Sequence, residues 1–227
     1  MRFLIQVFLV VLLSSSAANA QAALPGEIYV FGRYHMAAEE NSPLEPIEWQ
    51  ILEVEEDGTV FMAASHAIDG RRFNDSSYRG GWEKSSLRAW LNGEFLEIAF
   101  SDDEKAAIKD SKIENSRLWL FFETDQNTTS DRIFLLSLKE AKKYFNTEQR
   151  KLPATKYASM HLCRNLFGPG GSWWLRTSGL MPGRACSIDI NGMPFLPGSP
   201  ADSDGGCVRP ALRIKPSGLK LLKRKAD

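Results

Sequence analysis

Near the start of the chain, apolar and polar residues alternate with a period of two, which is typical of a strand with one buried face. The apolar members of this run are Ile47, Trp49 and Ile51. An Asp57-Gly58 pair follows, and glycine accepts the positive φ that a tight hairpin turn needs. The β-rich residues 59–64 come next. The pattern therefore predicts a hairpin over 46–64 with one face in solvent, after a shorter strand at 28–31.

A helical period replaces this alternation over residues 85–92. The residues on its apolar face are Leu87, Trp90 and Leu91. An Asn92-Gly93 pair suits a C-terminal cap, so we expect this helix to end there.

Two capping boxes, with serine three residues before glutamate, predict further helices. One begins at Ser101 and is expected to run through Ile108. The other begins at Ser137 and is expected to run through about Phe145. Residues 133–136 are all apolar and predict a short buried strand between these helices.

The last third returns to strand-like patterns. Strands are predicted at 172–177, 186–190, 193–196 and 207–214, with a hairpin turn at Asn191-Gly192. The order is thus strands, helices, strands. Segregated elements of this kind favour an α+β fold with an antiparallel sheet.

The first twenty residues have the three parts of a secretory signal. Arg2 supplies a positive charge, residues 3–13 are almost entirely apolar, and Ala18 and Ala20 suit signal peptidase. We expect cleavage before Gln21. The apolar run is shorter than the roughly 20 residues that span a bilayer, so we predict export to the periplasm or the medium and no membrane span in the mature chain.

Residues 21–227 are predicted to form one domain, with a core at about 27–215 and a basic tail at 216–227. No repeat or long low-complexity linker divides them. Lys plus Arg and Asp plus Glu each number 28, and no basic stripe points to nucleic acid. The basic residues near the C-terminus are interpreted as a solvated tail.

Three cysteines occur, all in the last third, and an oxidising compartment favours pairing two of them. Cys186 and Cys207 each open an apolar stretch interpreted as neighbouring strands, so we predict a bond between them and a free Cys163. No C-x-x-C pair suggests zinc. We assign no metal, cofactor or catalytic residue.

Several phrases occur in an order that resembles the bacterial domain-of-unknown-function family numbered 6273. They are PIEW at 46–49, WEKSSLRAWLN at 82–92, FLLS at 134–137 with Glu140, YA at 157–158, WWLR at 173–176 and VRPAL at 208–212. The resemblance covers nearly all of the mature chain and implies little about activity.

A more distant resemblance lies in GGSW at 170–173, Arg184-Ala185 and GCVR at 206–209. These phrases are similar to the ending of formylglycine-generating-enzyme-like domains. The resemblance implies a C-type-lectin-like α+β fold, with a twisted antiparallel sheet, flanking helices and long loops. The copper-binding cysteine pair of those enzymes has no equivalent, because Cys186 has no partner at a matching spacing.

Adjacent tryptophans on a strand point to opposite faces, so one of Trp173 and Trp174 is expected in the core and the other toward solvent or a ligand. An exposed indole and nearby arginines are typical of binding hot spots. We therefore predict a surface platform of Trp174, Arg176, Asp204 and Arg209. The alternative is that the loop at 197–206 covers Trp174 and that Arg209 pairs with a buried acid.

These patterns favour an exported, non-enzymatic binding or interaction domain whose surface ligand is a glycan or an envelope protein. Two alternatives stay open, an exported hydrolase acting on envelope polymers and a structural envelope component. A deep pocket with convergent acids would favour the hydrolase, and a shallow aromatic platform would favour the binding domain.

Overall fold

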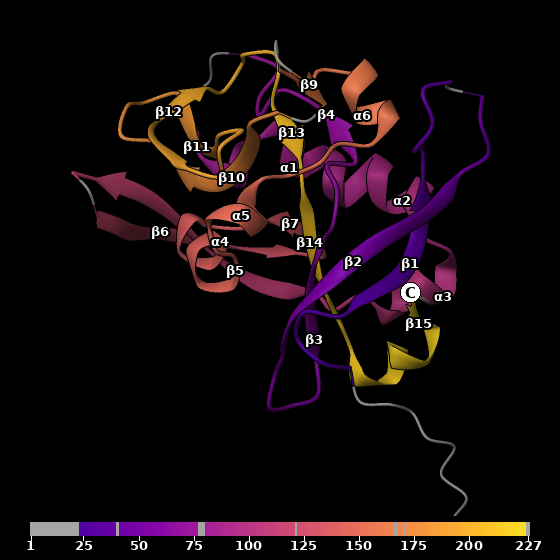
Figure 1. Cartoon of the computed structure of the whole chain (residues 1–227). Helices are drawn as coiled ribbons and strands as arrows, with labels where there is room; N and C mark the ends of the chain where they lie inside the picture. Colours follow the sequence, from indigo (N-terminus) through magenta and orange to yellow (C-terminus); the bar gives the residue numbers. More distant parts are fainter. Residues whose placement is uncertain are drawn as a thin grey trace, which may run out of the picture.

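The computed structural model describes residues 23–39, 41–76, 80–120, 122–165, 168–169 and 171–225. The predicted signal at 1–20 lies outside the described residues. Two main sheets and a few short helices make up the described part, and most strand pairs are antiparallel (Figure 1). The fold is therefore mixed α/β with mostly antiparallel sheets.

The first sheet has the strand order β15-β1-β2-β3-β14-β7, and all its pairs are antiparallel. The strands are β1 (Ile28–Tyr34), β2 (Glu45–Val54), β3 (Val60–Ala64), β7 (Ile133–Leu135), β14 (Pro210–Ile214) and β15 (Lys223–Arg224). The predicted hairpin at 46–64 is confirmed, with Gly58 at a φ of 79° in its turn. Its second strand, β3, is buried at every position, so the prediction of one face in solvent is wrong for this strand.

The second sheet has the order β12-β11-β10-β13-β4, and the β5–β6 hairpin joins it through β10. Its strands are β4 (Asp69–Gly70), β5 (Ser111–Trp119), β6 (Phe122–Asp131), β10 (Trp173–Ser178), β11 (Arg184–Ile188), β12 (Pro194–Pro200) and β13 (Cys207–Val208). Strand β10 pairs in parallel with both β13 and β5. A separate two-stranded ladder joins β8 (Arg164–Asn165) to β9 (Gly168–Pro169).

The helices are α1 (Ser86–Trp90), α2 (Leu96–Ala99), α3 (Asp102–Ala107), α4 (Leu138–Tyr144), α5 (Thr147–Arg150) and α6 (Lys156–Met160). Both predicted capping boxes form, at Ser101 and Ser137. The predicted end at Asn92-Gly93 is wrong, because a π-helical turn at Leu91–Phe95 carries α1 directly into α2. None of the helices in the described ranges is long and apolar enough to cross a membrane.

The chain passes between the two sheets at several places, and two of them, β3 into β4 and β13 into β14, meet at Arg209. The single strand predicted at 207–214 divides at Arg209, where the chain changes sheets. Arg209 is 2% exposed, and its Nε donates to the Ala64 carbonyl oxygen at 2.9 Å, at the end of β3. This contact links the two crossing segments.

The predicted Cys186–Cys207 disulfide is wrong. Cys207 is bonded to Cys163 instead, with their Cα atoms 4.5 Å apart, and Cys186 is buried outside any disulfide. The reason is strand order, because β10 lies between β11 and β13. Two strand spacings amount to about 10 Å, beyond the roughly 7 Å that a disulfide can bridge.

Candidate functional site

Trp174, the centre of the predicted platform, is 2% exposed and packs inside the protein. Its Nε1 donates to the Arg71 carbonyl oxygen at 2.8 Å. Gly206 covers the indole so closely that a Cβ there would lie 1.7 Å from Nε1, which explains the glycine. The end of the loop at 197–206 therefore covers Trp174, as the alternative interpretation expected.

Arg176 and Arg209 are also buried, at 4% and 2% exposure. Arg176 donates to the Leu135 carbonyl oxygen at 2.8 Å and to the Glu140 carboxylate. Burial acts to raise the pKa of Glu140, but Arg176 and hydrogen bonds outweigh it and hold that pKa below its usual value.

Aromatic rings enclose the Arg209 guanidinium, which lies 3.9 Å from the Phe145 ring centroid and 5.2 Å from that of Trp173. Burial lowers the pKa of this guanidinium to about 9. No buried acid pairs with it among the described residues. Asp204 alone of the predicted platform is exposed, in an ion pair with Arg72 at 2.8 Å. The predicted surface platform is therefore wrong for Trp174, Arg176 and Arg209.

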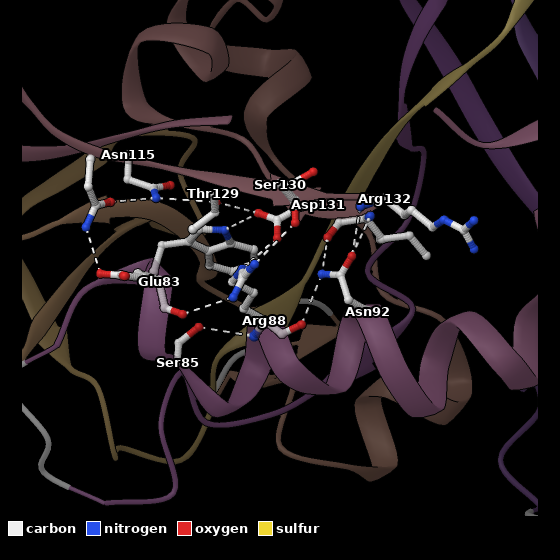
Figure 2. Close-up of polar contacts among 12 residues, drawn as sticks. Glu83, Ser85, Arg88, Asn92, Asn115, Thr129, Ser130, Asp131 and Arg132 are labelled. Carbon is white, nitrogen blue, oxygen red and sulfur yellow. Dashed lines mark hydrogen bonds and ion pairs between the residues drawn. The ribbon is translucent and has the colours of Figure 1, made fainter. Parts of the chain in front are cut away.

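The segment at 82–92, which contains Trp82 and Arg88, builds a closed polar cluster around Asp131 (Figure 2). Asp131 is 1% exposed. Its carboxylate accepts from Trp82 Nε1 at 2.8 Å, from Arg88 Nε at 2.6 Å and from Thr129 Oγ1 at 2.7 Å. We call Asp131, Arg88 and Trp82 the closed cluster.

The remaining donors of the closed cluster also have partners. Arg88 Nη1 donates to the Glu83 carbonyl oxygen at 3.1 Å, and its Nη2 donates to that of Ser130 at 3.2 Å. One turn further along the helix, the Asn92 amide exchanges hydrogen bonds with the backbone of Arg132 and Ile133 (Figure 2). This side of the helix therefore holds β6 and β7 in place.

The opposite side of the same helix lines a cleft with a volume of about 760 Å³. Residues four apart lie on one helical face, so Ser86, Trp90 and Glu94 point to a different side from Arg88 and Asn92. The other walls come from β4 with the residues after it, and from α6. They include Asp69, Arg71, Arg72, Asp75, Tyr157 and His161.

Asp69 lies at the base of this cleft and is 2% exposed. It accepts hydrogen bonds from Tyr34 Oη at 3.2 Å, from Arg71 Nε at 3.1 Å and from the Gly70 amide at 2.8 Å. Burial, and next the negative charge of Asp69, raise the pKa of Tyr34 above its usual range. The phenol is therefore neutral and able to donate.

Arg71 lies over Trp90, with its guanidinium carbon 4.0 Å from the ring centroid. Its side chain is 36% exposed. Within the described part of the chain, its two Nη groups have no hydrogen-bond acceptor, and neither has the buried Trp90 Nε1. We call Asp69, Arg71 and Trp90 the open cluster, because Arg71 and Trp90 retain unused donors.

The third wall, α6, is held against β4 by the disulfide. Cys163 follows α6, and Cys207 pairs with Gly70 in the β13–β4 ladder. A Cβ at Gly70 would lie 1.9 Å from the Cys163 backbone nitrogen, so the two walls meet without room for a side chain. On α6, the rings of Tyr157 and His161 stand 4.0 Å apart between centroids.

A family model described as "Domain of unknown function (DUF6273)" matches residues 57–216, well over half of the chain. The chain belongs to this family. Neither the curated proteins nor the solved structures contain a match. The match includes all residues of both clusters, whereas Tyr34, which donates to Asp69, lies before it.

Sequence reasoning missed Asp69, Arg71 and the cleft altogether. The sequence offers only a partial signal for the cleft. Trp90 and Tyr157 belong to the phrases that resemble the family, but the helical pattern places Trp90 on an apolar face that is expected to be buried. Nothing in the sequence around Asp69-Gly-Arg-Arg indicates that Tyr34 and Trp90 lie beside it. Within the described ranges, no group of three or more potential metal ligands is found.

Proposed function

We propose that this protein is an exported, non-enzymatic binding domain whose ligand presents a carboxylate to Arg71 in the cleft. The observation that supports this proposal is the state of the Arg71 side chain. Asp69 accepts from Nε, the Trp90 ring supports one face, and the two Nη groups have no acceptor among the described residues. A guanidinium held in this way is preorganised to bind a carboxylate end-on through both Nη groups.

The other residues that line the cleft limit the chemical class of the ligand further. Asp75 and Glu94 also line the cleft, so a polyanion would be repelled. A single carboxylate next to hydroxyl or ammonium donors fits this mixture of charges better. Both an acidic glycan and a peptide terminus carry such groups, and the experiment below separates these two sources.

Export is supported by the signal-like first twenty residues. The Cys163–Cys207 disulfide is compatible with an oxidising compartment, either the periplasm or the medium. For the fold itself, the phrases at 170–173 and 206–209 support a C-type-lectin-like arrangement, which we include in the proposal.

A hydrolase acting on envelope polymers is the rival function. It would need a carboxylic acid that is free to transfer a proton or attack the substrate. Asp69, the buried acid of the cleft, already accepts three hydrogen bonds, from Tyr34, Arg71 and the Gly70 amide. This arrangement favours a positioning role for Asp69, so a hydrolase would have to use Asp75 or Glu94, the other acids that line the cleft. A purely structural envelope component would need no cleft with unused donors.

The proposal is tested with the mature protein, residues 21–227, on an array of acidic and neutral glycans and of peptides with free or amidated C-termini. Calorimetry on the ligands that bind should show at least a tenfold weaker affinity for Arg71→Gln, because the end-on pair is lost. Arg33→Gln is the matched control, since Arg33 is exposed on β1 away from the cleft.

Binding that does not depend on Arg71 would contradict the proposed site. Turnover of a bound polymer, abolished by Asp75→Asn or Glu94→Gln, would instead establish the hydrolase.

A further inference from the structure

The tip of the β5–β6 hairpin carries three large apolar side chains in solvent. Trp119 is 65% exposed, Leu120 is 63% exposed and Phe122 is 73% exposed. Single exposed apolar residues are ordinary on a protein surface, but a contiguous group marks an interaction site. We call these three residues the apolar tip.

The hairpin holds the apolar tip away from the body of the protein (Figure 1). Trp119 pairs directly with Phe122 across the ladder, so the two rings share one face of the hairpin. Leu120 follows at the turn with a positive φ of 56°. The residue before the tip, Leu118, is 1% exposed and packs in the main core. This packing fixes strand β5 directly before the tip.

The shape of the tip decides what kind of partner it fits. Trp119 and Phe122 are exposed on one face of the hairpin and Leu120 is exposed at the turn, so the end of the hairpin is apolar at its turn as well as on one face. A flat protein partner would cover that face and leave the turn in water. A fluid apolar medium covers a convex end on all sides.

We propose that the apolar tip inserts into the interfacial region of a lipid bilayer. From the Arg117–Thr124 pair to the Trp119–Phe122 pair the hairpin extends by two residues, or roughly 7 Å. Interfacial segments bury about 5–10 Å into the boundary between headgroups and acyl chains, where tryptophan is favoured. Directly behind the tip, Arg117 pairs with Thr124, so the polar boundary begins within two residues.

The charges near the tip indicate the lipid class. Arg117 is close to the tip on β5, whereas Asp125 lies on β6 opposite Ser116. The hairpin end thus has no excess of positive charge with which to attract anionic lipid. We therefore assign a zwitterionic surface, such as phosphatidylcholine or phosphatidylethanolamine, as the partner.

The test measures co-flotation of the mature protein with phosphatidylcholine vesicles. The wild-type protein should float with the vesicles, and binding should persist in 0.5 M salt because apolar contacts are not screened (about 4 Å Debye length). The double variant Trp119→Ser/Phe122→Ser should lower the partition coefficient at least tenfold. Its melting temperature should be unchanged, because both side chains are exposed.

The matched control is Ile190→Ser/Met193→Ser, which removes two exposed apolar side chains on another loop, 40% and 53% exposed. It should bind vesicles like the wild type, and so should Arg71→Gln, which separates this inference from the proposed ligand cleft. Wild-type protein that fails to float, or a tip variant that floats equally well, would overturn the inference. Self-association that needs the tip, seen by sedimentation equilibrium in the absence of vesicle binding, would assign the tip to a second copy of the chain and also overturn it.

Discussion

The helix that begins at Ser86 separates two clusters built from the same three residue types. On one side, Asp131 receives hydrogen bonds from Arg88 and Trp82. On the other side, Asp69 receives one from Arg71, which lies over Trp90. The closed cluster satisfies every polar group of its arginine and tryptophan, whereas the open cluster leaves the Arg71 Nη groups and Trp90 Nε1 without acceptors among the described residues.

This difference separates a structural role for the closed cluster from the binding role that we propose for the open cluster. A satisfied buried network holds elements in a single arrangement, because removing any member leaves a buried polar group unpaired. Unused donors beside a cleft contribute little to folding and remain available to a ligand. The residue types alone therefore do not distinguish scaffold from site.

The largest effect is expected from breaking the closed cluster with Asp131→Ala. The change leaves the buried Trp82 Nε1 and the partly exposed Arg88 charge without their carboxylate acceptor, and the loss of a buried ion-pair partner costs up to about 5 kcal/mol. Urea denaturation should show this drop in the free energy of unfolding. The control Asp204→Ala removes an exposed ion pair and should barely shift the midpoint. A small effect of Asp131→Ala would mean that the closed cluster is not a scaffold.

The disulfide is expected to contribute nearly as much and to act on the open cluster. Closing a loop across a sequence separation of 44 stabilises by about 4 kcal/mol in the chain-entropy model. Cys163→Ser should therefore lower the unfolding free energy and also weaken ligand binding, because α6 loses its attachment to β4. Cys186→Ala is the control, and a peptide map of the native protein should contain the 163–207 link. A map that links Cys186 instead would contradict the structure.

The smallest expected effect is also the sharpest comparison of the two clusters. Trp82→Phe and Trp90→Phe each remove an indole N–H and a similar volume from a buried site. Only Trp82 loses a hydrogen bond to a carboxylate, so its variant should be less stable by about 2 kcal/mol than that of Trp90. Paired denaturation curves measure this difference. Equal losses would show that Trp90 Nε1 has a partner after all.

Local patterns in the sequence predicted the elements whose hydrogen bonds join nearby residues. The capping boxes at Ser101 and Ser137 formed as expected, since their contacts span three residues. The hairpin at 46–64 formed for the same reason, with Gly58 in its turn. The sequence phrases also placed the chain in its family.

Other predictions failed where the outcome depends on distant segments. The hairpin at 111–131 was not predicted, because most of its residues are polar and its pairing to β10 is long-range. Asn92-Gly93 resembled a helix end, but the side chain of Asn92 binds the backbone at Ile133 and the helix continues.

The sequence by itself determined the capped helices, the tight turn at Gly58 and the family. Only the tertiary structure decided that Trp174, Arg176 and Arg209 are buried, because that depends on how the second sheet is covered. It also decided which cysteines pair, through the order of β11, β10 and β13. The tertiary structure also decided the cleft. Tyr34, Asp69, Trp90 and Tyr157 come from four separate segments of the chain. No local sequence pattern shows which segments meet in the folded protein.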